Sequence, residues 1–162
     1  QPGSKHSYTP YYFNLFKDRV REIKKVLEIG VGEAAGLKMW RDFFPNAQIY
    51  GAEIDPKRIV NEDRIKVVLC DQTSRDNLLS LIKEIGSDID FVVEDASHIP
   101  EDQVFTCLTL MPLLNQDVIY IIEDVADVGI VKELTDYNLE IPVLLPKKTR
   151  YDDHIIVVRH PQ

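Results

Sequence analysis

Cysteine is scarce in this sequence of 162 residues, which contains only Cys70 and Cys107. Each lies within an apolar run, where a buried, reduced thiol is the usual state. Two such residues supply neither the dense disulfide framework of small secreted domains nor the paired spacing of a zinc site. The sequence therefore predicts a protein of a reducing compartment, and we expect it in the cytoplasm.

Long apolar runs and clusters of basic residues are also missing. No uninterrupted apolar segment approaches the roughly 20 residues that a membrane helix needs, and the first four residues resemble a truncated or processed start without a basic and apolar leader. The formal net charge is −8, with the lysines and arginines scattered along the chain. Because nucleic-acid backbones attract basic surfaces, this charge argues against general nucleic-acid binding. The composition favours a small acceptor molecule as the partner, away from membranes.

The length of the chain fits one compact domain with a sizeable core. We find no internal repeat, low-complexity tract or Gly/Ser-rich linker. We therefore divide the chain into a leader with a cap helix, residues 1–24, and a single domain, residues 25–162. The sequence does not set the oligomeric state, so a homo-oligomer is one arrangement to be tested.

Strand-like and helix-like segments alternate along the chain. Seven apolar runs rich in β-branched residues predict strands at 26–29, 48–54, 65–69, 89–93, 118–122, 141–145 and 155–158. Helical patterns cover 11–24, 37–44, 75–85, 101–114 and 129–137. This alternation predicts an α/β fold with a mostly parallel sheet that helices cover on both faces. A loop alone, residues 146–154, joins the last two runs, which predicts a terminal antiparallel strand.

Ligands of such sheets bind beyond the carboxyl ends of the strands, so the residues that follow each strand are informative. The first strand leads into Gly30-Val31-Gly32, where glycines permit a tight turn and close approach of a ligand to the backbone. Glu53 follows the second strand, about 20 residues later, where an acid can accept both hydrogen bonds of a ribose diol. Asp71 and Gln72 follow the third, where they can meet an adenine amino group or cap the next helix. An ordinary strand-to-helix turn is the alternative explanation for the glycines.

The charge of Glu28 helps to choose between two cofactors. The spacing Gly30-x-Gly32-x-x-Ala35 also fits a dinucleotide fingerprint, so an NAD-dependent oxidoreductase is one alternative. A carboxylate directly before the turn would face the pyrophosphate of a dinucleotide, whereas it could pair with the α-ammonium group of a methionine moiety. Glu28 therefore favours S-adenosylmethionine.

Acidic residues end the fourth and fifth strands, which should be neighbours at the centre of the sheet. Asp95 follows the fourth strand, and Glu123 and Asp124 follow the fifth. Like charges in one crevice raise one another's pKa unless a cation neutralises them, and oxygen ligands suit Mg²⁺. We therefore expect Asp95, Glu123 and Asp124 to hold Mg²⁺.

His98 is the histidine that the sequence ties to these acids. Near neutral pH its imidazole can take the proton of an acceptor hydroxyl, which makes His98 the expected general base. The alternative is that Asp95 and Ser97 cap the helix that follows, with His98 on the surface.

Taken together, these motifs resemble the class I S-adenosylmethionine-dependent methyltransferases over almost the whole chain. More narrowly, the sequence is similar to the metal-dependent sugar O-methyltransferases of macrolide biosynthesis. The segments that carry this similarity are Lys5-His6-Ser7-Tyr8, residues 27–32, 37–40, 44–45, 95–98, 122–124 and 151–153. One departure is Ala34, which stands where these enzymes usually have a third glycine; an alanine is tolerated there if its φ is negative and nothing presses on its methyl group.

The resemblance implies a Rossmann-like sandwich, S-adenosylmethionine as cofactor, and the same Mg²⁺ ligands and base that the acids and His98 suggest. It also implies that Tyr8 closes over the cofactor, with a packed leader residue as the alternative. The expected reaction is O-methylation of a hydroxyl on a sugar or small metabolite. A cofactor-binding module with little activity alone is the alternative, because no large insertion between the fifth and last strands builds an acceptor pocket.

Overall fold

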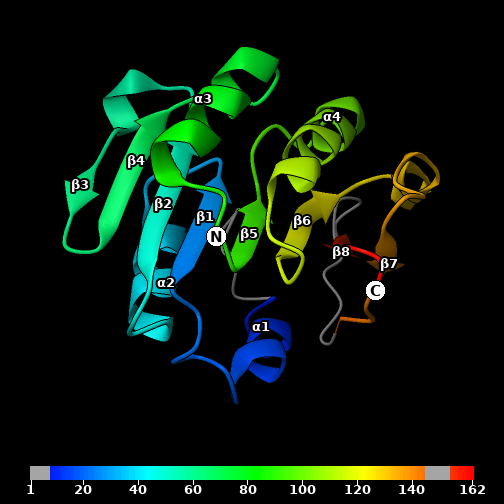
Figure 1. The fold of residues 1–162 in the computed structure, drawn as a ribbon, viewed down its shortest axis with the longest axis horizontal. Coiled ribbons are helices and arrows are strands. Elements are labelled where there is room, and N and C mark those ends of the chain that lie inside the picture. The colour runs from blue at the N-terminus through cyan, green and yellow to red at the C-terminus, as the bar shows by residue number, and fades with distance from the viewer. Residues whose placement is uncertain (1–7, 145–153) are drawn as a thin grey trace.

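The computed structural model describes residues 8–144 and 154–162 (Figure 1). Within these residues eight strands form one sheet in the order β3-β4-β2-β1-β5-β6-β8-β7. The strands are β1 (Lys25–Ile29), β2 (Gln48–Glu53), β3 (Asn61–Glu62), β4 (Ile65–Leu69), β5 (Phe91–Glu94), β6 (Ile119–Val125), β7 (Asn138–Glu140) and β8 (His154–Arg159).

The centre of the sheet is parallel and both of its edges contain antiparallel pairs. Strands β4, β2, β1, β5 and β6 pair in parallel. Strand β8 runs antiparallel between β6 and β7, and β3 is antiparallel to β4. The α/β class, the mostly parallel sheet and the antiparallel strand near the C-terminus are therefore confirmed.

Two details of the strand prediction are wrong. The sheet has eight strands among the described residues instead of seven, because β3 contains only two exposed residues and leaves no apolar pattern. The strand expected at 141–145 lies earlier, at β7, where exposed Asn138 and Glu140 flank Leu139 at the edge of the sheet. An edge strand with solvent on one side needs few apolar residues, so the apolar run that follows was misleading. Most of the loop expected at 146–154 falls outside the described residues.

Four α-helices occur in the described part of the chain: α1 (Thr9–Phe16), α2 (Ala35–Phe43), α3 (Arg75–Ile85) and α4 (Pro100–Leu110). Helix α3 has the predicted bounds, and the Ser74 hydroxyl caps it by accepting a hydrogen bond from the Asn77 amide. Short 3₁₀ helices cover η2 (Pro56–Arg58), η3 (Met111–Leu113) and η4 (Val128–Glu133). Helix α1 is shorter than predicted because turns follow Phe16, and η4 replaces the helix expected at 129–137.

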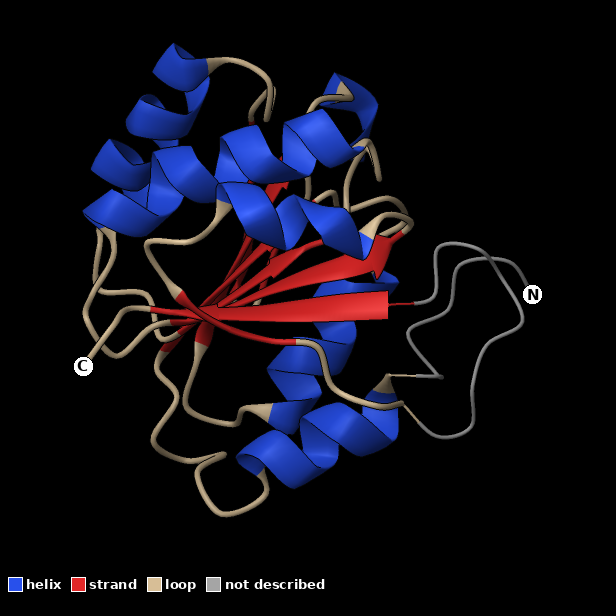
Figure 2. Cartoon of the chain, turned by 90° about the vertical axis from the view of Figure 1, so that its right-hand side faces the viewer, coloured by secondary structure: helices blue, strands red, loops and turns tan. Residues whose placement is uncertain are grey.

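Helices cover both faces of the sheet, which separates two layers of core (Figure 2). Leu78 and Leu81 of α3 and Cys107 and Leu110 of α4 pack in one cluster. The other cluster joins α1 and α2 to the opposite face and is rich in aromatic rings. Cys70 and Cys107 are both buried and free, as predicted. Among the described residues no helix is long and apolar enough to cross a membrane.

Candidate functional site

A cavity of about 340 Å³ opens at the carboxyl ends of the parallel strands. The loops after β1, β2, β4 and β5 form its walls, which places it where ligands of this type of sheet bind. The predicted residues among its lining are Gly30, Gly32, Glu53, Asp71, Gln72 and Asp95. The structure therefore brings most of the expected cofactor residues and one expected metal ligand to a single cavity.

The turn after β1 requires glycine at two positions for different reasons. Gly30 has a φ of +88°, and a Cβ atom there would lie 2.3 Å from the Asp95 carbonyl oxygen. Gly32 has a φ of +55°, but a Cβ atom would have open space, with the nearest atom of Arg58 4.0 Å away. Gly30 is thus required by backbone conformation and by close packing, and Gly32 by conformation alone.

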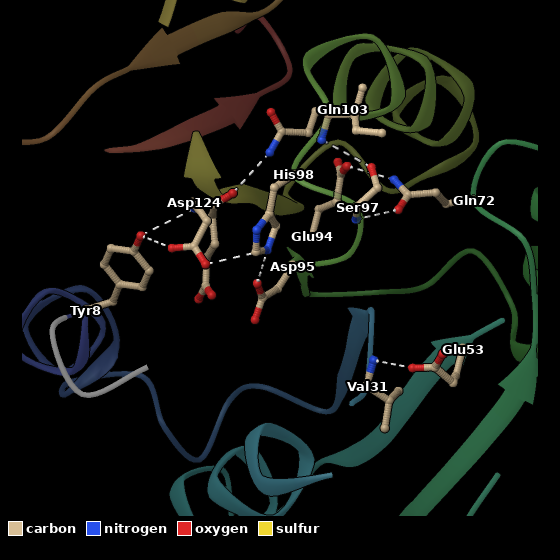
Figure 3. Close-up of polar contacts among 12 residues, drawn as sticks. Tyr8, Val31, Glu53, Gln72, Glu94, Asp95, Ser97, His98, Gln103 and Asp124 are labelled. Atoms are coloured by element: carbon tan, nitrogen blue, oxygen red, sulfur yellow. Dashed lines mark hydrogen bonds and ion pairs between the residues drawn. The ribbon is translucent and has the colours of Figure 1, made fainter. Parts of the chain in front are cut away.

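The carboxylate of Glu53 holds this turn in place (Figure 3). One oxygen, Oε2, accepts hydrogen bonds from the Val31 amide at 3.0 Å and the Gly32 amide at 3.1 Å. The other oxygen, Oε1, accepts from the Asp55 amide at 3.0 Å. Glu53 is buried but still lines the cavity, so the same carboxylate orients the turn and offers its remaining lone pairs to a ligand.

Ala34 adopts the left-handed conformation that the missing third glycine would favour. Its φ is +63°, so the condition of a negative φ is not met. An L-residue in this region is strained by about 1–2 kcal/mol. The Ala34 carbonyl accepts the first hydrogen bond of α2 from the Lys38 amide at 3.1 Å.

Asp71 and Gln72 have different roles in the structure, although both line the cavity. The Asp71 carboxylate accepts hydrogen bonds from the Thr73 amide at 2.8 Å and the Thr73 hydroxyl at 2.7 Å, which fixes the turn before α3. The Gln72 amide group donates to Glu94 at 3.1 Å, and its carbonyl oxygen accepts from the Ser97 amide at 3.1 Å. Gln72 therefore ties the end of β4 to the loop that carries Asp95 and His98 (Figure 3).

Glu94 is a buried acid to which sequence reasoning gave no role. Its carboxylate accepts hydrogen bonds from the Tyr120 hydroxyl at 2.8 Å and from Gln72. Burial raises the pKa of Glu94 to about 8, although these two hydrogen bonds act in the opposite direction. Because alternate strand residues face opposite sides of a sheet, Glu94 lies on the α3 and α4 side with Tyr120, separate from the neighbouring Asp95. An acid at an inward position of a buried strand was the signal that could have identified it.

Asp95, His98 and Asp124 form an acidic group with histidine at its centre. The Nε2 atom of His98 lies 3.0 Å from Asp95 Oδ1 and 3.5 Å from Asp124 Oδ2. One ligand atom from each of the three residues lies within 4.8 Å of the others (Figure 3). His98 and Asp124 both have left-handed backbones, with φ values of +58° and +50°. Strained backbones of this kind are concentrated at functional sites.

Glu123 lies outside that group and faces the helices α1 and α2. Its carboxylate accepts a short hydrogen bond from the Tyr12 hydroxyl, and its main-chain oxygen accepts one from the Gln103 side chain at 3.1 Å. Both Glu123 and Tyr12 are buried. The structure therefore brings two of the three expected metal ligands together with the expected base, and it places the third beside a tyrosine.

Glu28 and Tyr8 are not among the residues that line the cavity. The carboxylate of Glu28 is buried and accepts a hydrogen bond of 2.5 Å from the Trp40 indole. The Tyr8 hydroxyl donates to Asp124 Oδ1 at 2.5 Å and accepts from the Asp124 amide at 3.3 Å. Trp40 and Tyr12 both lie in the core, and their polar contacts depend on neighbours that are distant in the sequence. The cofactor roles of Glu28 and Tyr8 stay predictions.

Proteins with similar sequences are O-methyltransferases. Mycinamicin VI 2''-O-methyltransferase of Micromonospora griseorubida is 36% identical over 129 residues, which are 75% of this chain and 32% of that protein. Demethylmacrocin O-methyltransferase of Streptomyces fradiae is 31% identical over 98% of this chain and 47% of its own length. An O-methyltransferase of Streptomyces olivaceus that acts on a rhamnosyl tetracenomycin is 39% identical over 74% of this chain and 33% of its own length. No family model matches the chain.

Solved structures give the same result for the fold. The MycE methyltransferase of the mycinamycin pathway, in complex with Mg, SAH and mycinamycin VI, matches 99% of this chain and 50% of its own. The TM-score of this match is 0.79 and the sequence identity is 27%. The chain has the class I methyltransferase fold and is homologous to these O-methyltransferases. Human methyltransferase-like protein 13, with a TM-score of 0.73 and 18% identity, shares the fold alone.

The chain spans half or less of the length of these relatives. It spans 32% of the mycinamicin enzyme, 47% of the demethylmacrocin enzyme and 50% of the MycE structure. The MycE match covers 99% of this chain, so it includes the sheet, the cavity and the acidic group.

Proposed function

We propose that this chain is the catalytic domain of an S-adenosylmethionine-dependent methyltransferase that methylates a hydroxyl of a sugar or small metabolite with the help of Mg²⁺. The position of Asp95 carries this proposal. Asp95 lines the cavity at the strand ends and also belongs to the acidic group with His98 and Asp124. A methyl donor in the cavity and an acceptor hydroxyl at the acidic group would therefore meet at one residue.

The cavity offers the contacts that S-adenosylmethionine requires. The glycine turn allows the backbone to approach the cofactor closely, and Glu53 is placed to accept hydrogen bonds from a ribose diol. Asp71 and Gln72 lie on the wall formed by the end of β4, which is the expected side for adenine. Glu28 remains the expected partner of the α-ammonium group. Bound cofactor supplies an electrophilic methyl group on sulfur.

The acidic group has the chemistry of an Mg²⁺ site. Asp95 and Asp124 supply carboxylate oxygens close together, and Glu123 adjoins Asp124 on β6. Hard divalent cations prefer such oxygen ligands and usually keep several waters that substrate hydroxyls can replace. A cation held there would supply positive charge that makes an acceptor hydroxyl easier to ionise.

His98 would act as the general base. Its Nε2 atom lies between the two carboxylates, and the side chain is about one third exposed, so it can reach an acceptor. His98 would take the proton of the acceptor hydroxyl as its oxygen receives the methyl group, and the bound cofactor would leave as S-adenosylhomocysteine. The Asp95 carboxylate beside the ring would stabilise the imidazolium that results.

The relatives support a sugar hydroxyl of a glycoside as the acceptor, because three of them are O-methyltransferases of mycinamicin VI, demethylmacrocin and a rhamnosyl tetracenomycin. The short length of this chain favours a second candidate. The chain spans only about half of the MycE structure, so acceptor binding would depend on a further segment or a partner subunit. In that case the chain would bind cofactor but turn over slowly alone. A homo-oligomer would be one source of the missing contacts.

Calorimetric titration with S-adenosylhomocysteine tests the cofactor, with NAD as the control ligand. We expect micromolar binding of S-adenosylhomocysteine and none of NAD; the reverse preference would refute the proposal. Methyl transfer to glycosylated acceptors, measured with and without EDTA, then tests the metal. Turnover that EDTA leaves unchanged would refute the role of Mg²⁺. Cofactor binding without turnover would favour the cofactor-binding module over the complete enzyme.

A further inference from the structure

Two tyrosines, Tyr8 at the N-cap of helix α1 and Tyr12 within it, donate hydrogen bonds to the two neighbouring acids at the end of β6. Tyr12 donates to Glu123, and Tyr8 donates to Asp124 at 2.5 Å. The tyrosines are four residues apart, which places their side chains on one face of a helical turn. The acids are adjacent in the sequence. One face of α1 therefore contacts both acids that β6 contributes to the acidic end of the sheet.

Tyr12 is held rigidly by the aromatic cluster around it. Its ring meets Trp40 edge-on with 4.9 Å between ring centroids, and Phe91 with 5.8 Å. The residue is 2% exposed. A ring packed on several sides cannot move without disturbing the core, so the hydroxyl has one position. The Tyr12 hydroxyl thus provides a fixed donor for one oxygen of Glu123.

We propose that Tyr12 and Tyr8 are positioning residues for a divalent cation, acting through Glu123 and Asp124. Each tyrosine donates to one oxygen of its carboxylate and so restricts the orientation in which that carboxylate can meet a cation. Helix α1 is in this way part of the functional site as well as a cover for the sheet. The inference rests on the Mg²⁺ site of the proposed function and assigns new residues to it.

Partners of this kind have measurable effects in metalloproteins. Removing a hydrogen bond to a ligating side chain typically reduces metal affinity or activity about 10–100-fold, because the ligand must then be ordered when the metal binds. Removal of the Tyr12 hydroxyl should leave the cofactor cavity unaffected, since Tyr12 is not among the residues that line it. Metal affinity and cofactor affinity therefore separate a positioning role from general damage to the fold.

The test uses Tyr12→Phe and Tyr8→Phe, which remove only the hydroxyl groups. Binding of Mn²⁺ alone is followed by the loss of the free-ion electron paramagnetic resonance signal. We expect each variant to bind Mn²⁺ about 10-fold more weakly or worse, with the S-adenosylhomocysteine affinity of Tyr12→Phe unchanged. Tyr11→Phe is the matched control on the same helix, because the charged groups that act on the Tyr11 hydroxyl are Glu140 and Arg159 and not those of the acidic group.

A double-mutant cycle shows whether Tyr12 acts through Glu123. In a Glu123→Gln background, Tyr12→Phe should cause no further loss of Mn²⁺ affinity; an equal loss in both backgrounds would overturn the inference. Wild-type Mn²⁺ affinity in both Phe variants would also overturn it, without affecting the proposed function. Absence of Mn²⁺ binding by the wild-type chain would overturn the metal part of both. If Tyr12→Phe fails to fold, Tyr8→Phe with Asp124→Asn provides the same cycle.

Discussion

The main chain of Gly30 packs directly on the main chain of Asp95: a Cβ atom at position 30 would lie 2.3 Å from the Asp95 carbonyl oxygen and 2.6 Å from the Ala96 Cα atom. Both of these atoms belong to backbone, which cannot turn away as a flexible side chain can. The glycine turn of the cavity and the loop that begins the acidic group therefore share one contact. A substitution that displaces either segment should therefore displace the other.

Gly30→Ala should damage both halves of the site. The clash and the left-handed conformation together should lower the free energy of unfolding by about 2–5 kcal/mol. Displacement of the Asp95 loop should weaken Mn²⁺ binding as well as S-adenosylhomocysteine binding. Urea unfolding and the two titrations measure these effects. Gly32→Ala is the control, because it adds strain of about 1–2 kcal/mol without a clash; equal losses in the two variants would contradict the packing argument.

Gln72→Met should loosen the loop between β5 and α4. Methionine has a similar length but cannot accept the hydrogen bond of the Ser97 amide or donate to Glu94. We expect a loss of about 1–3 kcal/mol in the free energy of unfolding, because buried polar groups lose a partner. Gln116→Met, at an exposed glutamine that donates to the Pro161 carbonyl, should change it by less than about 0.5 kcal/mol. Equal free energies of unfolding for the two variants would show that the hydrogen bonds of Gln72 do not stabilise this loop.

His98→Asn should abolish the base without disturbing the backbone. Asparagine tolerates the left-handed conformation, which His98 adopts at φ +58°, better than alanine does. The rate constant for methyl transfer should fall by about 10²–10⁴-fold, with S-adenosylhomocysteine affinity and melting temperature retained. Single-turnover kinetics with a glycosylated acceptor provide the measurement. A transfer rate close to that of the wild type would mean that a group other than His98 takes the hydroxyl proton.

Glu94→Gln should change how stability depends on pH. The pKa of Glu94 is raised to about 8 in the folded protein, so the folded state keeps a proton that the unfolded state loses near its ordinary pKa. The stabilisation from this group is complete below the unfolded pKa and is lost as pH rises through about 8. Between the unfolded pKa and about pH 8, the difference in unfolding free energy, wild type minus variant, should therefore fall by up to about 1.4 kcal/mol per pH unit.

Urea unfolding of both proteins at several values between pH 5 and pH 8.5 isolates this effect, because their other titrating groups are the same. The variant also keeps an oxygen that can accept from Tyr120 or Gln72. A difference that stays constant over the whole range would mean that Glu94 is ionised in the folded protein throughout.

Much of the fold could be predicted because its signals are local. The buried parallel strands are short apolar runs, and Arg75–Ile85 has both a helical period and a serine cap. Residues at the carboxyl ends of those strands could therefore be predicted to line the cavity, and Gly30, Glu53 and Asp95 do line it. Weakly patterned segments were missed: the two residues of β3 and the exposed edge strand β7 bury too little to leave a periodic signal.

The sequence by itself determined which acids end which strands, because strand order along the chain and alternation along each strand are local properties. Only the tertiary structure decided what each acid contacts. Glu123 meets Tyr12 from 111 positions away, and Glu94 meets Gln72 from 22 positions away. The acids Glu94, Asp95 and Glu123 have the same chemistry in the sequence. Their environments differ because the helices packed on the two faces of the sheet bring different hydrogen-bond donors to each carboxylate.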